Sequence, residues 1–271
     1  MARYDLSGKV VLITGATDGL GRALARAVLD AGATVLVHGR SEERIAATVA
    51  ELDGGDRVRS YRADLASIAE VHALADTVLG AEERLDVLVN NAGIGARTGS
   101  VEERETSADG HELRFAVNHL AAFALTERLL ELLERSAPAR IVNVSSLGQQ
   151  AINFDDVMLE HGYSGVRAYC QSKLAQILFT FELAPRLAGT GVTVTALHPA
   201  TYIPTKMVRS PISTLEQGVE ATLRLVADPA ADGVTGRFYD GLREATPDAQ
   251  AADPDARRRL WELSERLTAR S

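Results

Sequence analysis

Tyr169 and Lys173 are residues whose types and spacing could do chemistry together. They lie in the stretch AYCQSKLAQI, residues 168–177, in which apolar residues recur at helical spacing. Residues four apart lie one above the other on a helix, so both side chains should point the same way. A nearby cation lowers the pKa of a tyrosine from its unperturbed ~10, which would let the phenol exchange protons closer to neutral pH. The alternative is an exposed pair on a solvated face.

A glycine-rich turn follows the first apolar run. The run VVLI at 10–13 leads into TGATDGLG at 14–21 and then into a helical pattern. Gly15, Gly19 and Gly21 stand where a strand-to-helix turn needs positive φ or close backbone approach. The backbone N–H groups at the helix start would then offer a site for a pyrophosphate. Taken alone, the glycines also fit a simple tight turn.

Short apolar runs alternate with amphipathic stretches, which predicts βαβ units. The runs are continuous, as expected for parallel strands that are covered on both faces. We expect strands near 10–13, 34–37, 87–89, 141–144, 192–197 and 237–239. We expect helices near 20–31, 42–52, 68–79, 112–134 and 168–188, and a last helix that Asp253 caps and Pro254 begins. The sequence thus predicts an α/β fold with a doubly wound parallel sheet.

Composition narrows the class of protein. The 271 residues are 46% hydrophobic and 24% charged, which is ordinary for a globular protein. A net charge of −8 makes nucleic acid or an anionic membrane an unfavoured partner. No apolar run is long enough to span a membrane, and the single cysteine, Cys170, suits a reducing compartment. Since no linker divides the chain, we expect one domain over 1–271, located in the cytoplasm.

Other catalytic chemistries find little support. The six histidines show neither an H-E-x-x-H motif nor clustered spacing, so we expect no metal site. A G-x-S-x-G hydrolase elbow is missing from the sequence. Cys170 lies beside Tyr169 but has no base next to it in the sequence, so core packing explains this thiol better than a nucleophilic role does.

Several motifs together resemble the short-chain dehydrogenase/reductase family, and they occur in the order typical of that family. They are TGATDGLG at 14–21, NNAG at 90–93, Asn118, VNVSS at 142–146 and YCQSK at 169–173. The stretch 168–194 further resembles the retinol-dehydrogenase-like branch. The resemblance implies a single-domain Rossmann fold of about seven strands with helices on both faces. It also implies an oxidoreductase that uses a nicotinamide cofactor.

The resemblance assigns catalysis to Asn118, Ser146, Tyr169 and Lys173. Tyr169 is then the general acid in reduction and the general base in oxidation, while Lys173 lowers its pKa and binds the nicotinamide ribose. Ser146, at the end of the fifth strand, would hold the substrate oxygen, with Ser145 as the neighbouring alternative. Asn118 would hold a water that links the lysine to solvent, and the alternative is a hydrogen-bonded core asparagine.

The residues after the second strand predict NADP(H). NAD-binding folds usually place a carboxylate there, whereas this chain has Gly39 and Arg40. The guanidinium could bind a 2′-phosphate through paired hydrogen bonds, so NADP(H) is preferred and NAD(H) is the alternative. Arg40 could instead be a surface residue paired with Glu42 or Glu43. Asp18 stands against the preference, because some NADP-using relatives carry a basic residue in that turn.

The resemblance implies further cofactor contacts. Asp64 and Leu65, after the third strand, would contact the adenine, although Asp64 could also cap a helix. Asn91, Ala92 and Gly93 would lie beside the adenosine and its ribose. The remaining expected contacts are Gly15, Thr17, Asp18, Gly19, Leu20, Gly21, Tyr169, Lys173, Pro199, Ile203 and Thr205.

Two segments depart from the shortest family members. The longer insert at 147–167 should shape the substrate pocket; the alternative is a surface excursion whose apolar residues pack down. Its candidate lining residues are Gln149, Ile152, Phe154 and Met158. Ala200 replaces the usual glycine after Pro199, and the segment up to Thr205 is about one residue longer. We expect the loop at 200–214 to act as a substrate lid.

Three functions fit this fold. The leading one is an NADP(H)-dependent carbonyl reductase or alcohol dehydrogenase that acts on an apolar small molecule. The alternative is a non-catalytic regulatory or structural protein that binds a nicotinamide dinucleotide, although the intact Ser146, Tyr169 and Lys173 argue against it. An epimerase or dehydratase would usually carry TGxxGxxG spacing. The resemblance also implies a homodimer or homotetramer that pairs through the helices near 112–134 and 168–188.

Overall fold

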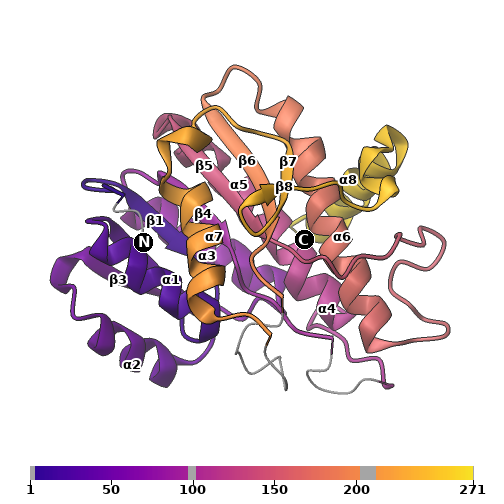
Figure 1. Cartoon of the computed structure of the whole chain (residues 1–271). Coiled ribbons are helices and arrows are strands. Elements are labelled where there is room, and N and C mark those ends of the chain that lie inside the picture. The colour runs from indigo at the N-terminus through magenta and orange to yellow at the C-terminus, as the bar shows by residue number, and fades with distance from the viewer. Residues whose placement is uncertain (1–3, 97–101, 202–211, 271) are drawn as a thin grey trace.

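The computed structural model describes residues 4–96, 102–201 and 212–270. They form one eight-stranded sheet in the order β3-β2-β1-β4-β5-β6-β7-β8, with helices on both faces (Figure 1). Neighbouring strands are parallel except for β7 and β8, which are antiparallel. The strand order reverses between β1 and β4, and open α/β sheets bind ligands at the carboxyl ends beside such a reversal. The predicted doubly wound α/β fold is confirmed.

Six of the eight described strands follow the apolar runs of the sequence. The strands are β1 (Val10–Ile13), β2 (Thr34–Gly39), β3 (Val58–Arg62), β4 (Val87–Asn90), β5 (Ala139–Val144), β6 (Val192–His198), β7 (Arg237–Asp240) and β8 (Arg243–Glu244). The other two, β3 and β8, have mostly exposed residues and do not follow such a run. About seven strands were expected, and the eighth is the two-residue β8, which pairs with β7. Both of its residues are exposed, so no apolar pattern marks this strand in the sequence.

Six of the eight described helices follow a residue whose side chain caps them. The helices are α1 (Gly19–Asp30), α2 (Glu42–Leu52), α3 (Ile68–Ala81), α4 (Leu113–Phe115), α5 (Ala121–Arg135), α6 (Gly165–Arg186), α7 (Leu215–Ala227) and α8 (Pro254–Thr268). Helices α5 and α6 are the exceptions. Asp253 caps α8 and Pro254 takes its first position, as expected. Helix α7 was not among the expected helices, and it starts with a capping box between Thr214 and Gln217.

Two apolar layers cover the sheet. Residues of α1, α2 and α7 pack on one face, and residues of α3, α5 and α6 on the other. The C-terminal helix α8 lies against α6 and α5 (Figure 1). Its Trp261 meets the rings of Phe123 and Phe179 at centroid distances of 5.0 and 5.9 Å, and Arg186 stacks on it at 3.8 Å. Helix α8 therefore covers part of the two helices that were expected to pair subunits.

The helix expected near 112–134 is not regular. Residues Ala116–Leu120 form a π-helical turn between α4 and α5. Hydrophobic periodicity cannot reveal such a turn, which often occurs at functional sites. Helix α6 likewise begins at Gly165, three residues earlier than the expected 168, and ends at Arg186. Along the described chain, no helix combines the length and apolar character that crossing a bilayer requires.

Candidate active site

Ser146 and Tyr169 both lie beside Gly148, beyond the carboxyl end of β5. A Cβ added to Gly148 would lie 3.4 Å from Ser146 Oγ and 3.6 Å from Tyr169 Cε1. Ser146 was expected to end the fifth strand, but that strand ends at Val144. The two residues beyond the strand allow the backbone to turn, and the Gly148 N–H donates to Ser146 Oγ at 3.0 Å. Ser145 is not the one beside the tyrosine, since its hydroxyl donates to the carbonyl of Lys173 on α6.

Lys173 extends from α6 into the interior, next to Tyr169. Its Nζ lies 5.9 Å from the centroid of the Tyr169 ring and donates to the Val144 carbonyl at 2.8 Å and to Gln176 Oε1 at 2.9 Å. Burial disfavours the charged form and lowers the pKa of Lys173 to about 7. The pKa of His198, at the end of β6, is lowered by burial too, and the charge of Lys173 adds to that effect.

Asn118 borders the same lysine through Gly93. A Cβ on Gly93 would lie 3.2 Å from Asn118 Oδ1 and 3.4 Å from Lys173 Nζ. The Asn118 amide accepts from Ile94 N at 2.7 Å and donates to Ile94 O and to Ser172 Oγ. These contacts match the alternative of a hydrogen-bonded core asparagine. They also hold the π turn against the residues that follow β4, next to Lys173. The four predicted catalytic residues, Asn118, Ser146, Tyr169 and Lys173, therefore lie in one region.

The glycine turn between β1 and α1 has the geometry that its sequence predicts. Gly15 and Gly19 have φ values of +65° and +49°, and a Cβ on Gly21 would clash with the Gly15 carbonyl oxygen. The buried His38 ring fixes the turn: Gly15 N–H donates to Nδ1 at 3.1 Å, while Nε2 faces the Ala63 carbonyl at 3.2 Å. Burial lowers the pKa of His38 to about 4, so the ring is neutral and can accept at Nδ1.

Asp18 does more in this turn than the sequence indicated. It caps α1 by accepting from Gly19 N at 2.9 Å and forms an ion pair with Arg44 of α2 at 2.8 Å. Arg44 also donates to the carbonyl of Thr17 at 3.1 Å. The sequence did not predict a role for Arg44. Its position in the first turn of α2 was the one signal, and the contact with Asp18 depends on how α2 packs beside the glycine turn.

Arg40 is exposed directly after β2, at the carboxyl edge of the sheet. Among the described residues, neither Glu42 nor Glu43 forms an ion pair with it. The alternative of an ion pair with Glu42 or Glu43 is therefore not what the structure shows, and a role for Arg40 in binding a 2′-phosphate stays a prediction.

The other expected cofactor residues have varied surroundings. Asn91 donates its amide to the Thr14 carbonyl at 2.7 Å, and Thr14 Oγ1 accepts from the N–H groups of Asn91 and Ala92. Asp64 does not cap a helix: Ser67 caps α3, and the Asp64 carboxylate accepts a hydrogen bond from Ala66 N in the loop before it. The side chains of Leu20, Leu65 and Pro199 are buried. Ile203 and Thr205 lie outside the described residues.

A buried charge cluster, unforeseen from the sequence, joins the 147–167 insert to the site. Arg114 has no exposed surface and donates to the Gly95 carbonyl at 3.2 Å and to Tyr163 Oη at 2.6 Å. Glu112 lies 3.6 Å from Arg114 and accepts from Tyr163 Oη at 3.2 Å. Burial and this carboxylate raise the pKa of Tyr163 to about 12. The cluster ties the insert to the loop after β4.

The candidate lining residues of the insert pack inward. Ile152 is buried, and Phe154 and Met158 pack against the same apolar cluster as α6 and α8. Gln149 donates to Ser146 O and accepts from Asp248 N. This is the packing alternative that the sequence left open. Two other apolar residues of this region are exposed instead: Leu147, directly after Ser146, and Val166, three residues before Tyr169.

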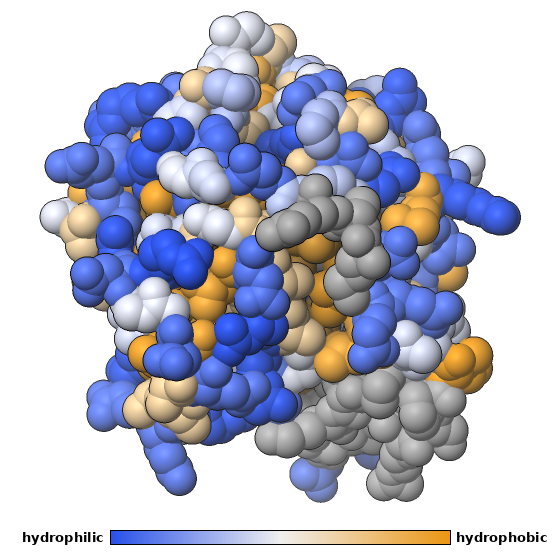
Figure 2. Space-filling view, turned by 60° about the vertical axis from the view of Figure 1, so that its left-hand side comes forward, coloured by the Kyte–Doolittle hydropathy of each residue, from blue (hydrophilic) through white to orange (hydrophobic). Residues whose placement is uncertain are grey.

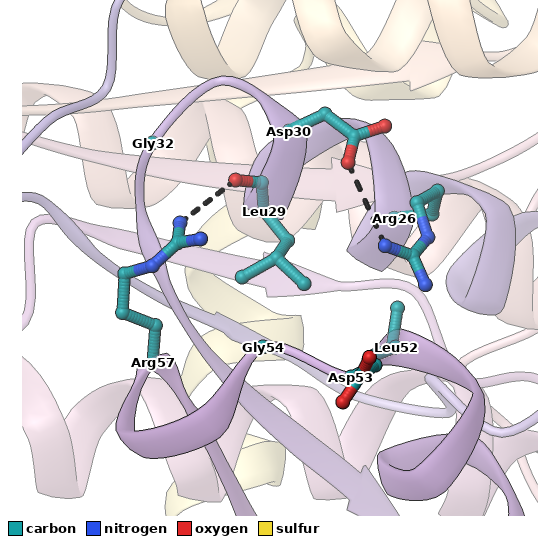
Figure 3. A pocket seen from close by; sticks show the side chains of 8 residues that line it. All are labelled: Arg26, Leu29, Asp30, Gly32, Leu52, Asp53, Gly54 and Arg57. Carbon is teal, nitrogen blue, oxygen red and sulfur yellow. Dashed lines mark hydrogen bonds and ion pairs between the residues drawn. The ribbon is translucent and has the colours of Figure 1, made fainter.

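A surface hollow lies at the opposite edge of the sheet, before β2 and β3 (Figure 3). Arg57 in it donates to the Leu29 carbonyl at 3.0 Å, and Arg26 pairs with Asp30 at 3.6 Å. Both guanidinium groups thus have partners within the protein. The hollow lies between the C-terminal ends of α1 and α2, and its residues make structural contacts. Within the described ranges, no group of three or more His, Cys, Asp or Glu residues could hold a metal.

A glycine turn at the strand-order reversal, together with a Ser-Tyr-Lys site, defines a Rossmann-fold oxidoreductase. The pattern of the short chain dehydrogenase family matches residues 9–215. The chain is 39% identical to mouse (Mus musculus) retinol dehydrogenase 13 over 290 residues, which cover 98% of this chain and 85% of the relative. The chain belongs to the short chain dehydrogenase family and acts on CH–OH groups with NAD(P).

Solved structures agree with this assignment. An uncharacterised protein from Mycobacterium paratuberculosis has a TM-score of 0.84 at 32% identity, covering 98% of this chain and 96% of that one. The RhlG/NADP active-site complex from Pseudomonas aeruginosa has a TM-score of 0.72 at 29% identity, covering 89% and 97%. The resemblance inferred from the motifs is confirmed.

Proposed function

We propose that this protein interconverts a carbonyl and an alcohol on an apolar small molecule with NADP(H), with Tyr169 as the proton donor and acceptor. The observation that carries the proposal is the buried Lys173 beside the Tyr169 ring, with Ser146 Oγ and that ring both next to Gly148. A buried cation next to a phenol favours the phenolate. Tyr169 would donate its proton to a carbonyl oxygen held by Ser146, and it would take that proton back in oxidation.

The residues present fit a nicotinamide dinucleotide. Gly21 lies so close to Gly15 that only glycine leaves the turn intact, and the first N–H groups of α1 suit a pyrophosphate. Arg40 would hold a 2′-phosphate, and Arg44 neutralises Asp18 nearby. When bound, the cofactor supplies or accepts the hydride. The similar Pseudomonas aeruginosa structure is a complex with NADP, which supports this choice over NAD.

Asn118 and Lys173 would connect the tyrosine to solvent protons. Asn118 Oδ1 and Lys173 Nζ both border Gly93, at the mouth of the β4 loop. Because burial lowers the pKa of Lys173 to about 7, its amino group can exchange between the amine and the ammonium form near neutral pH. That property suits a group that returns protons to Tyr169.

An apolar substrate is supported by the apolar side chains that stay exposed in the segments expected to shape the pocket. Leu147, Val166 and Ile212 are among the large apolar side chains that stay exposed, and they come from the insert, the start of α6 and the end of the 200–214 loop. Figure 2 shows apolar residues gathered in a hollow on one face of the molecule. The name of the relative, a retinol dehydrogenase, points to substrates of the same apolar class.

The decisive test is NADPH oxidation with a panel of apolar aldehydes, ketones, quinones and retinal-like enals. The wild type should turn over, while Tyr169→Phe should bind NADPH normally and lose turnover by about 100-fold or more. Cys170→Ala is the matched control and should keep its rate, since burial raises the pKa of that thiol. Turnover by Tyr169→Phe at the wild-type rate would contradict the proposal. NADPH binding without turnover of any substrate would favour the regulatory alternative.

A further inference from the structure

Gln176 is a buried side chain whose contacts lead to Lys173. It lies three residues after Lys173 on α6, is 1% exposed, and accepts from Lys173 Nζ through Oε1 at 2.9 Å. Its other amide atom, Nε2, is buried and has no protein partner among the described residues. One end of this amide therefore serves the lysine, and the other end makes no compensating hydrogen bond.

The folding of α6 does not explain a glutamine at this position. A buried amide donor without a partner destabilises a fold, and an apolar side chain of similar size would avoid that cost. The other buried glutamine of α6, Gln171, uses both ends of its amide, since it accepts from Asn153 N and donates to Val157 O. Gln171 thus holds the insert in place, whereas the one hydrogen bond of the Gln176 side chain within the described part of the chain goes to Lys173.

The orientation of the Gln176 amide depends on the charge of the lysine. If the amide turned over, its nitrogen would face an ammonium, and two donors cannot share a hydrogen bond. An ammonium has three donors, and Val144 O and Gln176 Oε1 accept two of them. The third is left for the side of Gly93, where a Cβ would lie 3.4 Å from Nζ. The two acceptors therefore aim the ammonium at the active site.

We propose that Gln176 is a positioning residue that keeps Lys173 charged and directed toward Tyr169 and the cofactor site. The inference rests on the proposed function of Lys173. The titratable groups that face the lysine are Tyr169 on its own helix and His198 at the end of β6. Within 4–96, 102–201 and 212–270, no carboxylate forms an ion pair with Lys173, which leaves two neutral oxygens to favour its charged form.

The composition of the chain makes a direct test feasible. The sequence contains three lysines, Lys9, Lys173 and Lys206, so a protein labelled with carbon-13 at the lysine ε carbon gives three side-chain signals. Lys9→Arg and Lys206→Arg identify the Lys173 signal. Titrating this signal in the cofactor-free protein reports the pKa of Lys173 without any assay of activity.

Two substitutions should move the titration of Lys173 in opposite directions. Gln176→Leu removes the acceptor and should lower the pKa of Lys173 by about one unit, whereas Gln176→Glu adds a negative charge and should raise it by at least as much. Thr180→Val is the matched control. Thr180 is buried one turn further on and donates to the Gln176 carbonyl, so its loss disturbs the same helix without touching Nζ.

The kinetic arm tests the consequence for the reaction. With a less charged lysine, the Tyr169 phenol ionises at higher pH, so the acid limb of kcat/KM for alcohol oxidation should move upward in Gln176→Leu. Turnover near neutral pH should fall by roughly ten-fold and recover as the pH rises. Gln176→Met replaces Gln176→Leu if the latter does not fold.

Each outcome decides the inference. Equal titration of Lys173 in wild type and Gln176→Leu would overturn it, and so would a shifted titration that leaves the rate profile unmoved. Opposite shifts in the Leu and Glu variants, with Thr180→Val unchanged, would support it. If the wild type has no turnover at all, the proposed function fails, while the titration still shows whether Gln176 maintains the lysine charge.

Discussion

The guanidinium of Arg44 forms an ion pair with the carboxylate of Asp18 across the glycine turn, with 2.8 Å between Nη2 and Oδ2. The same guanidinium donates to Thr17 O. Helix α2 is thereby tied to the turn that would hold the cofactor phosphates. Asp18 was the feature of the sequence that opposed NADP(H), and here its charge is neutralised by a residue from another helix.

Arg44→Ala should weaken NADPH binding by about five-fold, the upper range for one exposed ion pair. Without the charge of Arg44, the Asp18 carboxylate would repel the phosphates more strongly, and the 2′-phosphate adds to the negative charge of NADPH, so NADH binding should suffer less. Titration calorimetry with both cofactors checks this result. Asp18→Asn in the Arg44→Ala background should recover most of the loss. Arg26→Ala, in the remote hollow, should change neither affinity, and a five-fold loss there would contradict this explanation.

Arg40→Ala should abolish the preference for NADPH over NADH. A charge-assisted pair of hydrogen bonds to a phosphate contributes about 1.5–3 kcal/mol, so NADPH affinity should fall by roughly 10–100-fold. NADH affinity should stay the same, because NADH has no 2′-phosphate. The dissociation constants of both cofactors for wild type and variant provide the measurement. Equal affinities in the wild type would show that the preference for NADP(H) is wrong.

Gly21→Ala should eliminate cofactor binding and lower stability. Its new Cβ would clash with the Gly15 carbonyl, so the backbone of the turn must move. Gly80→Ala is the control: Gly80 lies in α3, and a Cβ there meets nothing within 4 Å. That variant should gain about 0.5–1 kcal/mol of stability and bind NADPH normally. Urea unfolding and cofactor titration of both variants test the pair, and normal NADPH binding by Gly21→Ala would refute the clash.

Lys173 should make the wild type more stable as the pH rises above neutral. Burial lowers the pKa of Lys173 from 10.5 to about 7 in the folded protein, so between these values the unfolded chain binds more protons. Stability then increases with pH across this window, by at most ~1.4 kcal/mol per pH unit. Lys173→Met should lack this increase. Urea unfolding of both proteins at several pH values from 6.5 to about 10 measures the difference, and parallel curves would contradict it.

Local patterns in the sequence predicted most of the fold, and the family resemblance selected the candidate catalytic residues. Short continuous apolar runs such as VVLI, bounded by turn residues, favour strands buried on both faces, and helical spacing puts Tyr169 and Lys173 on one side of a helix. Glycines with positive φ, such as Gly15, are legible because other residues avoid that conformation. Even the unexpected α7 carried a signal in its capping pair, Thr214 and Gln217.

Tertiary structure alone decided the contacts that surround these motifs. Two of these contacts join separate segments: the ion pair of Arg44 with Asp18, and the hydrogen bond from Arg114 to Tyr163. The hydrogen bond from Lys173 to Gln176 depends on the rotamers that both side chains adopt in the core. A sequence gives the type of a side chain and its local spacing, but not its burial or partners. Desolvation and long-range hydrogen bonding set the charge of Lys173 and the neutrality of His38, and both exist only once the chain has folded.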